Sequence, residues 1–132
     1  MSITQKAIYW IARLVAAVIM FQTLFFKFSG AEESIYIFET VGMEPWGRYG
    51  TGVFELIASV LLLITAVAWL GALIGLGLMV GAIGMHLTIL GIEVQGDGGQ
   101  LFIYALLVAV SCAYVLYVDR QKWLALVKKT LG

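Results

Sequence analysis

Apolar residues occur in long uninterrupted runs, and charged residues are confined largely to the gaps between these runs. The first run, residues 7–26, contains a single charge, and residues 56–92 and 101–118 contain none. As one helix, residues 56–92 would extend about 55 Å at 1.5 Å per residue, nearly twice the roughly 30 Å thickness of a bilayer's hydrocarbon core. This run must therefore fold back. The pattern predicts the turn at residues 68–71, where a tryptophan suited to the interface precedes a glycine that can end a helix.

The pattern predicts an all-α integral membrane protein with a single domain over residues 1–132. Its apolar runs are continuous rather than alternating with period two, which favours helices over the strands of a membrane barrel. We expect an up-and-down four-helix bundle whose membrane spans cover about residues 8–28, 49–69, 71–92 and 100–118.

Composition excludes several other classes of protein. Of the 132 residues, 62% are hydrophobic and 12% are charged, whereas an ordinary soluble domain has about 25% charged residues. A soluble monomer and a disordered chain are therefore excluded. Eight basic residues balance eight acidic ones, so no net field attracts nucleic acid. The chain has one cysteine, which cannot form a thiolate zinc site by itself, and we predict no metal site.

The signs of the charges predict how the chain crosses the membrane. Basic residues lie near both chain ends, at Lys6, Arg13, Arg120, Lys122, Lys128 and Lys129. Acidic residues crowd the first and third connections, at Glu32, Glu33, Glu39, Glu44, Glu93 and Asp97. Because basic residues favour the cytoplasmic side, both termini should be cytoplasmic, and this requires an even number of spans.

The first external connection, residues 29–49, has a helix pattern of its own. Ser29 and Glu32 have the spacing of a capping box, and a glycine and a proline farther on signal a stop. We therefore predict a short interfacial helix at about residues 30–41. Two interpretations stay open for this helix, a lid over a site and an anchor at the membrane interface. Residues 95–100 are predicted to form a plain turn.

Polar residues on separate spans share one depth in the predicted bundle. Counted from the middle of each span, Glu55, His86 and Tyr104 lie about 7 Å outside the midplane. Lys27 lies somewhat farther out on the same side. An unpaired Glu or Lys at this depth costs about 2–4 kcal/mol, so these side chains should find partners inside the bundle.

We predict that these four residues converge, with Ser59 nearby, in a polar pocket that opens toward the outer face. Glu55 is expected to pair with His86. Two alternatives stay open: the imidazole of His86 can bond to a neighbouring carbonyl, and Lys27 can extend to the lipid headgroups.

Other polar or reactive residues receive structural interpretations. Arg13 lies on the inner side, where it can reach the headgroups or Asp119, and is predicted to anchor the orientation. Cys112 lies near the bilayer centre, where a thiolate is costly, and is predicted to be structural. Gln22 faces away from the polar stripe of its own span and marks a candidate contact in a homo-oligomer.

Single polar residues mark the ends of otherwise apolar spans in a recurring way. Arg13 lies within the first span and Lys27 near its end, three residues before Gly30; Glu55 opens the second span, and His86 closes the glycine-rich third. This pattern resembles the DoxX family of small bacterial membrane proteins, over nearly the whole chain. The resemblance implies a multi-pass, four-helix protein of the bacterial cytoplasmic (inner) membrane.

The resemblance also implies a distant relationship to the membrane subunit of thiosulfate:quinone oxidoreductase, which passes electrons from a sulfur compound to quinone. The chain departs from some redox proteins in two ways. It has no cysteine pair for disulfide exchange and no second histidine for a bis-histidine haem.

In a first functional interpretation, the protein is a redox-associated membrane subunit whose outer pocket binds a quinone or a small sulfur compound. Glu55 and His86 are then catalytic and move protons. The residues expected to bind the substrate are Lys27, Arg48, Ser59 and Tyr104. No covalent cofactor is predicted, so quinone or a redox partner subunit would carry the electrons.

In a second interpretation, the same side chains receive a lipid, an isoprenoid or a partner membrane protein, and the chain is a non-catalytic binding or scaffold subunit. The sequence leaves open whether the protein is an enzyme. Transport is a third class, but Arg13 is the one ionisable residue in the inner half apart from the chain ends, so a continuous polar path through one protomer is disfavoured.

Overall fold

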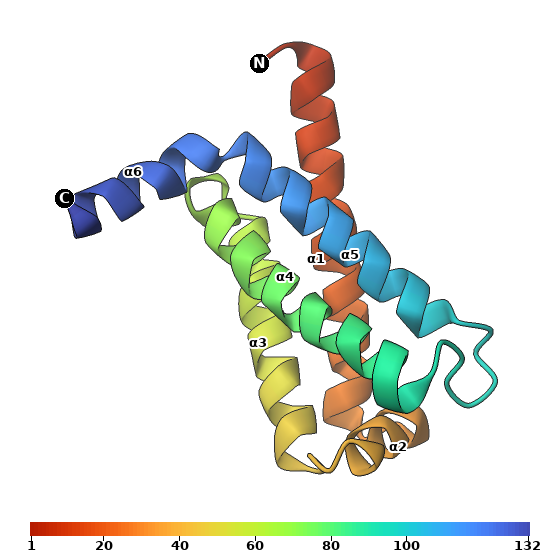
Figure 1. The fold of residues 1–132 in the computed structure, drawn as a ribbon. Helices are drawn as coiled ribbons and strands as arrows, with labels where there is room; N and C mark the ends of the chain where they lie inside the picture. The colour runs from red at the N-terminus through yellow and green to blue at the C-terminus, as the bar shows by residue number, and fades with distance from the viewer.

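The computed structural model describes residues 1–132 and is helical, without strands (Figure 1). The elements in chain order are α1 (Ile3–Ser29), α2 (Glu32–Thr40), α3 (Trp46–Leu62), η1 (Thr65–Val67), α4 (Ala68–Met85), η2 (His86–Leu90), α5 (Gln100–Val118) and α6 (Arg120–Leu131). η1 is one 3₁₀ turn, and η2 is a π-helical turn that continues α4. The all-α prediction is therefore confirmed.

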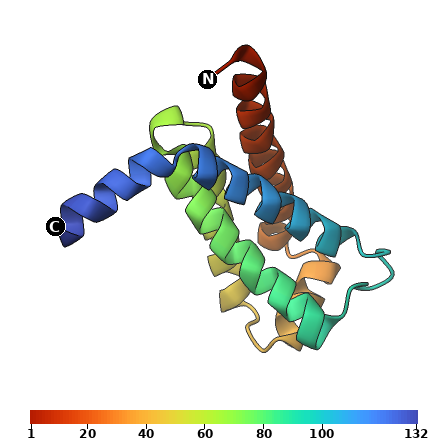
Figure 2. The ribbon, with the colours of Figure 1, turned by 45° about the horizontal axis from the view of Figure 1, so that its top comes forward.

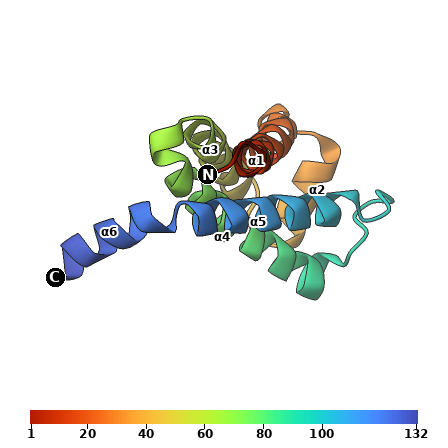
Figure 3. The ribbon, with the colours of Figure 1, turned by 90° about the horizontal axis from the view of Figure 1, so that it is seen from above.

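The long helices pack around one apolar core. α1 and α4 each lie against both α3 and α5. Seen from above, α1 and α3 lie on one side and α4 and α5 on the other (Figure 3). Alanines that are fully buried in the core allow these backbones to approach closely. The largest apolar side chains sealed within it are Met20, Leu62, Val108 and Val115.

Three helical segments are long and apolar enough to cross a membrane, namely Ile3–Ser29, Thr65–Leu90 and Gln100–Val118. Their outward faces expose large apolar side chains such as Phe25 and Val110, a surface that suits lipid rather than water. These features identify a membrane protein. α3, with 17 residues, is shorter, and its passage through the bilayer stays a prediction.

The chain reverses between α3 and α4 at residues 63–67, not at residues 68–71 as predicted. Arg13 of α1 explains the position, because its Nε donates to the carbonyl oxygen of Leu62 at 2.6 Å and its Nη1 donates to Thr65 Oγ1 at 3.2 Å. Gly71 serves close packing instead of helix termination. A Cβ at Gly71 would lie 2.7 Å from the carbonyl oxygen of Ala58, where α4 meets α3.

A short helix, α2, forms where one was predicted and lies across the end of the molecule farthest from the N-terminus (Figure 2). The predicted capping box is wrong, since Ser29 belongs to α1 and its hydroxyl donates to the Phe26 carbonyl at 3.3 Å. Gly30, with φ +71°, ends α1 in the left-handed conformation that glycine adopts readily. Ser34 and Phe38 are the buried residues of α2.

Both chain ends lie away from α2. α6 continues beyond α5 and projects from the packed helices (Figure 1), and it has no buried residue. At the opposite end, residues 91–99 form the connection into α5; they include residues 95–99 of the predicted turn, while Gln100 begins α5. The carboxylate of Asp97 accepts hydrogen bonds from the backbone amides of Val94, Gly99 and Leu101 at 2.8–3.2 Å, which stabilises this connection.

Candidate functional site

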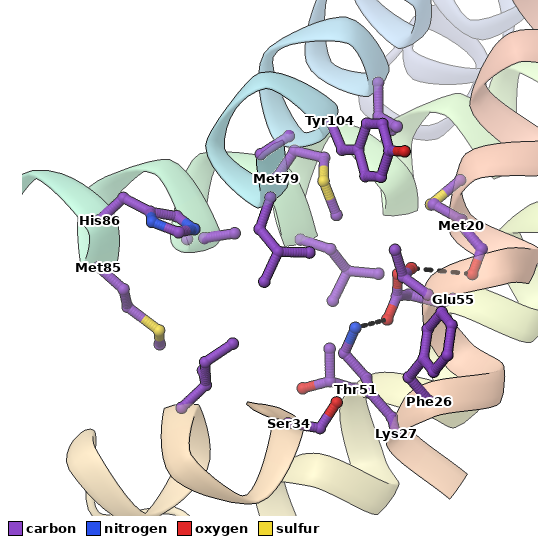
Figure 4. Close-up of a pocket in the computed structure, with 18 of the residues that line it drawn as sticks. Met20, Phe26, Lys27, Ser34, Thr51, Glu55, Met79, Met85, His86 and Tyr104 are labelled. Carbon is purple, nitrogen blue, oxygen red and sulfur yellow. Dashed lines mark hydrogen bonds and ion pairs between the residues drawn. The ribbon is translucent and has the colours of Figure 1, made fainter. Parts of the chain in front are cut away.

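A cavity of about 470 Å³ lies between α1, α3, α4 and α5, and α2 covers one end of it (Figure 4). Hydrophobic residues make up 16 of the 27 that line it, so its walls are mainly apolar. A smaller number of polar side chains interrupt these walls. They include all four residues predicted to converge in a pocket, namely Lys27, Glu55, His86 and Tyr104.

Lys27 and Glu55 form an ion pair at one side of the cavity. Lys27 Nζ lies 2.7 Å from Glu55 Oε1, and the hydroxyl of Thr23 donates to Glu55 Oε2 at 2.6 Å. The Glu55 side chain is 1% exposed and the Lys27 side chain 17%. Lys27 therefore pairs with Glu55 and does not extend toward the headgroups. Thr23 is a partner of Glu55 that sequence reasoning missed.

Ser59 lies behind this pair rather than on the cavity wall. Its hydroxyl donates to the backbone carbonyl of Glu55 at 2.7 Å, one helical turn earlier, and it is buried without lining the cavity. Ser59 therefore does not line the cavity, and its contact with a substrate stays a prediction. A serine in a membrane helix commonly binds the carbonyl four residues before it, which explains this outcome.

His86 does not pair with Glu55. Its Nδ1 lies 2.9 Å from the carbonyl oxygen of Gly91, and its ring packs edge-on against Phe102 with centroids 5.5 Å apart. Figure 4 shows the imidazole across the cavity from the Glu55 carboxylate. The predicted pair is therefore wrong, and the carbonyl alternative is the one found. The physical reason is the π-helical turn that begins at His86, which brings the Gly91 carbonyl under the ring.

The Gly91 carbonyl also fixes the tautomer of His86. A carbonyl oxygen only accepts hydrogen bonds, so Nδ1 must carry the proton. In the neutral imidazole, Nε2 is then left as an acceptor. His86 can accordingly take a proton at Nε2, and when protonated it can donate a hydrogen bond from that atom.

Tyr104 contributes a hydroxyl to the same cavity from α5. Its oxygen accepts a hydrogen bond from Gln100 Nε2 at 2.7 Å. The phenolic hydrogen stays available to donate to another group. Gln100 also lines the cavity, and its spacing of four residues from Tyr104 is the signal by which this pair can be recognised in the sequence.

Arg48 and Arg13 both lie outside the cavity. Arg48 is held by Glu44, with Nη2 2.8 Å from Oε1, and it also donates to the Lys27 carbonyl near the end of α1. Arg48 is thus engaged away from the cavity, and its contact with a substrate stays a prediction. Arg13 is fully buried at the opposite end of the molecule, where its guanidinium lies 3.8 Å from the centroid of the Trp10 ring. Its side chain is enclosed by the protein instead of extending to the surface.

Asp119, the predicted partner of Arg13, instead accepts a hydrogen bond from the Tyr9 hydroxyl at 2.6 Å. Cys112 is fully buried in the core beside Gly75, as predicted for a structural residue. Gln22, predicted to mark an oligomer contact, lines the edge of the cavity. The described chain contains no group of three or more His, Cys, Asp and Glu side chains placed to hold a metal ion.

α2 supplies cavity residues that sequence reasoning missed. Glu33, Ser34, Ile37 and Phe38 all line the cavity, at the spacing of one helical face. The spacing of these residues on one face was the signal in the sequence from which the contact could have been predicted. A helix that only anchors at the interface would not need to bury Ser34. The lid interpretation of α2 is the one that this placement favours.

Comparison with known proteins gives one match. The model of the DoxX family matches residues 8–89, which is more than half of the chain. The matched segment includes Arg13, Lys27, Glu55 and His86, the residues on which the resemblance rested. No curated protein and no solved structure matches the chain.

Proposed function

Since the chain belongs to the DoxX family, a family of membrane proteins, we propose that it binds the head group of a quinone in the cavity beneath α2. It then acts as a redox-associated subunit of the bacterial inner membrane, of the kind found in thiosulfate:quinone oxidoreductase. One observation carries this proposal: Tyr104, His86 and the Lys27–Glu55 pair interrupt the walls of a cavity that is otherwise mainly apolar.

The residues of the cavity fit a quinone in size and in chemistry. A volume of about 470 Å³ lies within the range of about 300–1,000 Å³ that is usual for small-molecule sites. The apolar walls suit a ring and part of an isoprenoid tail. The hydroxyl of Tyr104 can donate to a quinone oxygen, and Nε2 of His86 can accept a proton from a hydroxyl of the reduced form. When bound, a quinone supplies two-electron, two-proton chemistry.

The charges in the cavity favour a quinone over a sulfur oxyanion. Lys27 is the only lysine or arginine that lines the cavity, and Glu55 already neutralises it. Glu33 adds a second carboxyl group on the α2 side. Binding a dianion such as thiosulfate here would bury unpaired negative charge, which is costly. The neutral quinone ring avoids this cost.

We propose that α1, α3, α4 and α5 cross the membrane in up-and-down order. Both termini then lie in the cytoplasm, and α2 and residues 91–99 face the outer side. The basic residues of α6, together with Lys6 near the N-terminus, support this arrangement. It places the cavity in the outer half of the bilayer, where a membrane-dissolved quinone can reach it.

The experiment is thermal unfolding in mild detergent with a ubiquinone analogue that has one isoprene unit. A ligand that binds only the folded state stabilises it by about 2.7 kcal/mol at 100 times its dissociation constant. We expect Tyr104→Phe to weaken binding about fivefold to tenfold, because one hydrogen bond contributes about 1 kcal/mol. Tyr114→Phe is the matched control, since Tyr114 lies on the same helix outside the cavity.

A quinone that fails to stabilise the wild-type protein overturns the proposal. A second candidate function is non-catalytic binding of an isoprenoid or lipid, which the predominance of apolar residues around the cavity favours. A prenyl alcohol of matching length distinguishes the two. If the alcohol and the quinone stabilise the protein equally, and Tyr104→Phe changes neither effect, the second function is supported instead.

A further inference from the structure

Glu33, in the first turn of α2, is half-buried, and unlike Glu55, the other carboxyl group of the cavity, it has no basic partner. It lines the cavity, and its Oε1 atom is buried without a hydrogen-bond partner. No lysine, arginine or histidine forms an ion pair with it. A buried carboxylate oxygen without a donor is unfavourable, whereas a neutral carboxylic acid in the same place is tolerated.

None of the ionisable groups on the surrounding elements forms an ion pair with Glu33. On α1 and α3, Lys27 and Glu55 are committed to each other. On η2, Nδ1 of His86 is committed to Gly91, and on α5 the Tyr104 hydroxyl bonds to Gln100. In the 91–99 connection, Asp97 adds a negative charge that acts on Glu33.

The negative charge of Asp97 is itself fixed by the backbone. Burial alone would raise the pKa of Asp97, but hydrogen bonds from the amides of Val94, Gly99 and Leu101 outweigh burial and hold that pKa below its usual value. Asp97 therefore stays ionised. Burial first, and then the charge of Asp97, raise the pKa of Glu33 above that of an ordinary glutamate.

We propose that Glu33 is a further ligand-contacting residue, and that it acts as a neutral acid whose O–H donates a hydrogen bond to a carbonyl oxygen of the ligand. The inference rests on the proposed function, because it needs a ligand that carries a carbonyl group. A carboxylate can only accept hydrogen bonds and would repel that oxygen. The lid helix α2 would thus close over the ligand with a polar contact as well as with the apolar side chains of Ile37 and Phe38.

Binding of a carbonyl-bearing ligand is then linked to protonation of Glu33. Affinity is constant below the pKa of Glu33 and falls as pH rises through it, toward about tenfold per pH unit. The other polar groups of the cavity, among them Lys27, Glu55 and Tyr104, are unchanged in a Glu33 variant. The part due to Glu33 is therefore the difference between the wild-type profile and that of a Glu33 variant.

The test is the affinity of the one-isoprene ubiquinone analogue, measured across pH for the wild type, Glu33→Gln, Glu33→Leu and Glu32→Gln. The glutamine amide still donates, so E33Q should keep the low-pH affinity of the wild type and lose much of the decline at higher pH. E33L has no donor and should bind about fivefold to tenfold more weakly at low pH. Glu32 is exposed and does not line the cavity, so E32Q should follow the wild type.

A second readout needs no ligand. In infrared difference spectra recorded across pH, the wild type should show a carboxylic acid C=O band that persists to higher pH than an ordinary glutamate allows, and this band should be missing in E33Q. If the quinone binds but the pH profiles of the wild type and E33Q coincide, the proposed role of Glu33 is wrong and the proposed function still holds. No quinone binding at any pH overturns the proposed function and the ligand contact together, and the infrared band then shows whether Glu33 is protonated.

Discussion

Lys27 and Glu55 are buried unequally, and this asymmetry decides how the pair responds to substitution. The Glu55 carboxylate is 1% exposed, whereas the Lys27 side chain is 17% exposed and close to the end of α1. A lysine without its partner can extend along its flexible chain toward polar surroundings. A carboxylate without its partner stays in the cavity wall with Thr23 as its one donor.

We therefore expect Lys27→Met to destabilise the protein more than Glu55→Gln. Removing one partner of a buried pair costs about 3 kcal/mol when the remaining charge cannot reach water. E55Q keeps an acceptor for Thr23 and should cost about 1 kcal/mol. Chemical unfolding in detergent of both variants and of the double variant measures the difference and the coupling. Equal costs for the two single variants would contradict the unequal burial.

At the residue scale, sequence reasoning located side chains better than it located their partners. Depth counting placed Lys27, Glu55, His86 and Tyr104 on one cavity, because depth depends only on helix rise and connectivity. The partner of His86 depends on a π-helical turn, and no local pattern in the sequence predicts such a turn. Arg48 was assigned to a substrate because its partner Glu44 belongs to a connection whose backbone course was not known.

At the element scale, the end of α3 depends on a side chain from α1. The pattern of apolar residues runs unbroken from α3 into α4, so it contains no boundary of its own. Arg13 provides the boundary, since its guanidinium binds the carbonyl of Leu62 and the hydroxyl of Thr65. A long-range contact of this kind cannot be read from a local sequence pattern, which is why the predicted turn lay several residues too late.

Arg13→Met should loosen this reversal. The Leu62 carbonyl would lose its buried donor, and we expect a loss of about 2 kcal/mol in the free energy of unfolding. Hydrogen–deuterium exchange should increase first at residues 63–67. Arg120→Met is the matched control, because Arg120 is exposed and surface substitutions usually change stability by less than about 0.5 kcal/mol. If exchange rises equally across all helices in R13M, the arginine does not act on the reversal in particular.

At the scale of the whole molecule, the two ends differ in chemistry. The end with both termini carries the basic helix α6, and the other end carries α2 with Glu32 and Glu33. The helical class, the membrane character and the family could all be predicted from the sequence, because they depend on composition and on spaced polar residues. The course of the connections could not, since it depends on contacts such as those of Asp97 within residues 91–99.

Cysteine substitution tests the proposed orientation. In sealed right-side-out vesicles, a membrane-impermeant thiol reagent should label Glu93→Cys directly. It should label Thr4→Cys and Thr130→Cys only after the membrane is opened, because the termini are expected on the cytoplasmic side. All three positions are exposed. If either terminal variant is labelled in sealed vesicles, the proposed orientation of the chain is wrong.

The sealed position of Cys112 gives the natural chain a built-in reporter. Its sulfur is fully buried in the centre of the packed helices, so a thiol reagent reaches it only when α4 and α5 separate. The rate at which the unmodified protein reacts would therefore time the opening of the core in native lipid, without any engineered label. Because Cys112 does not react while the protein stays folded, it adds no background to the labelling of the introduced cysteines.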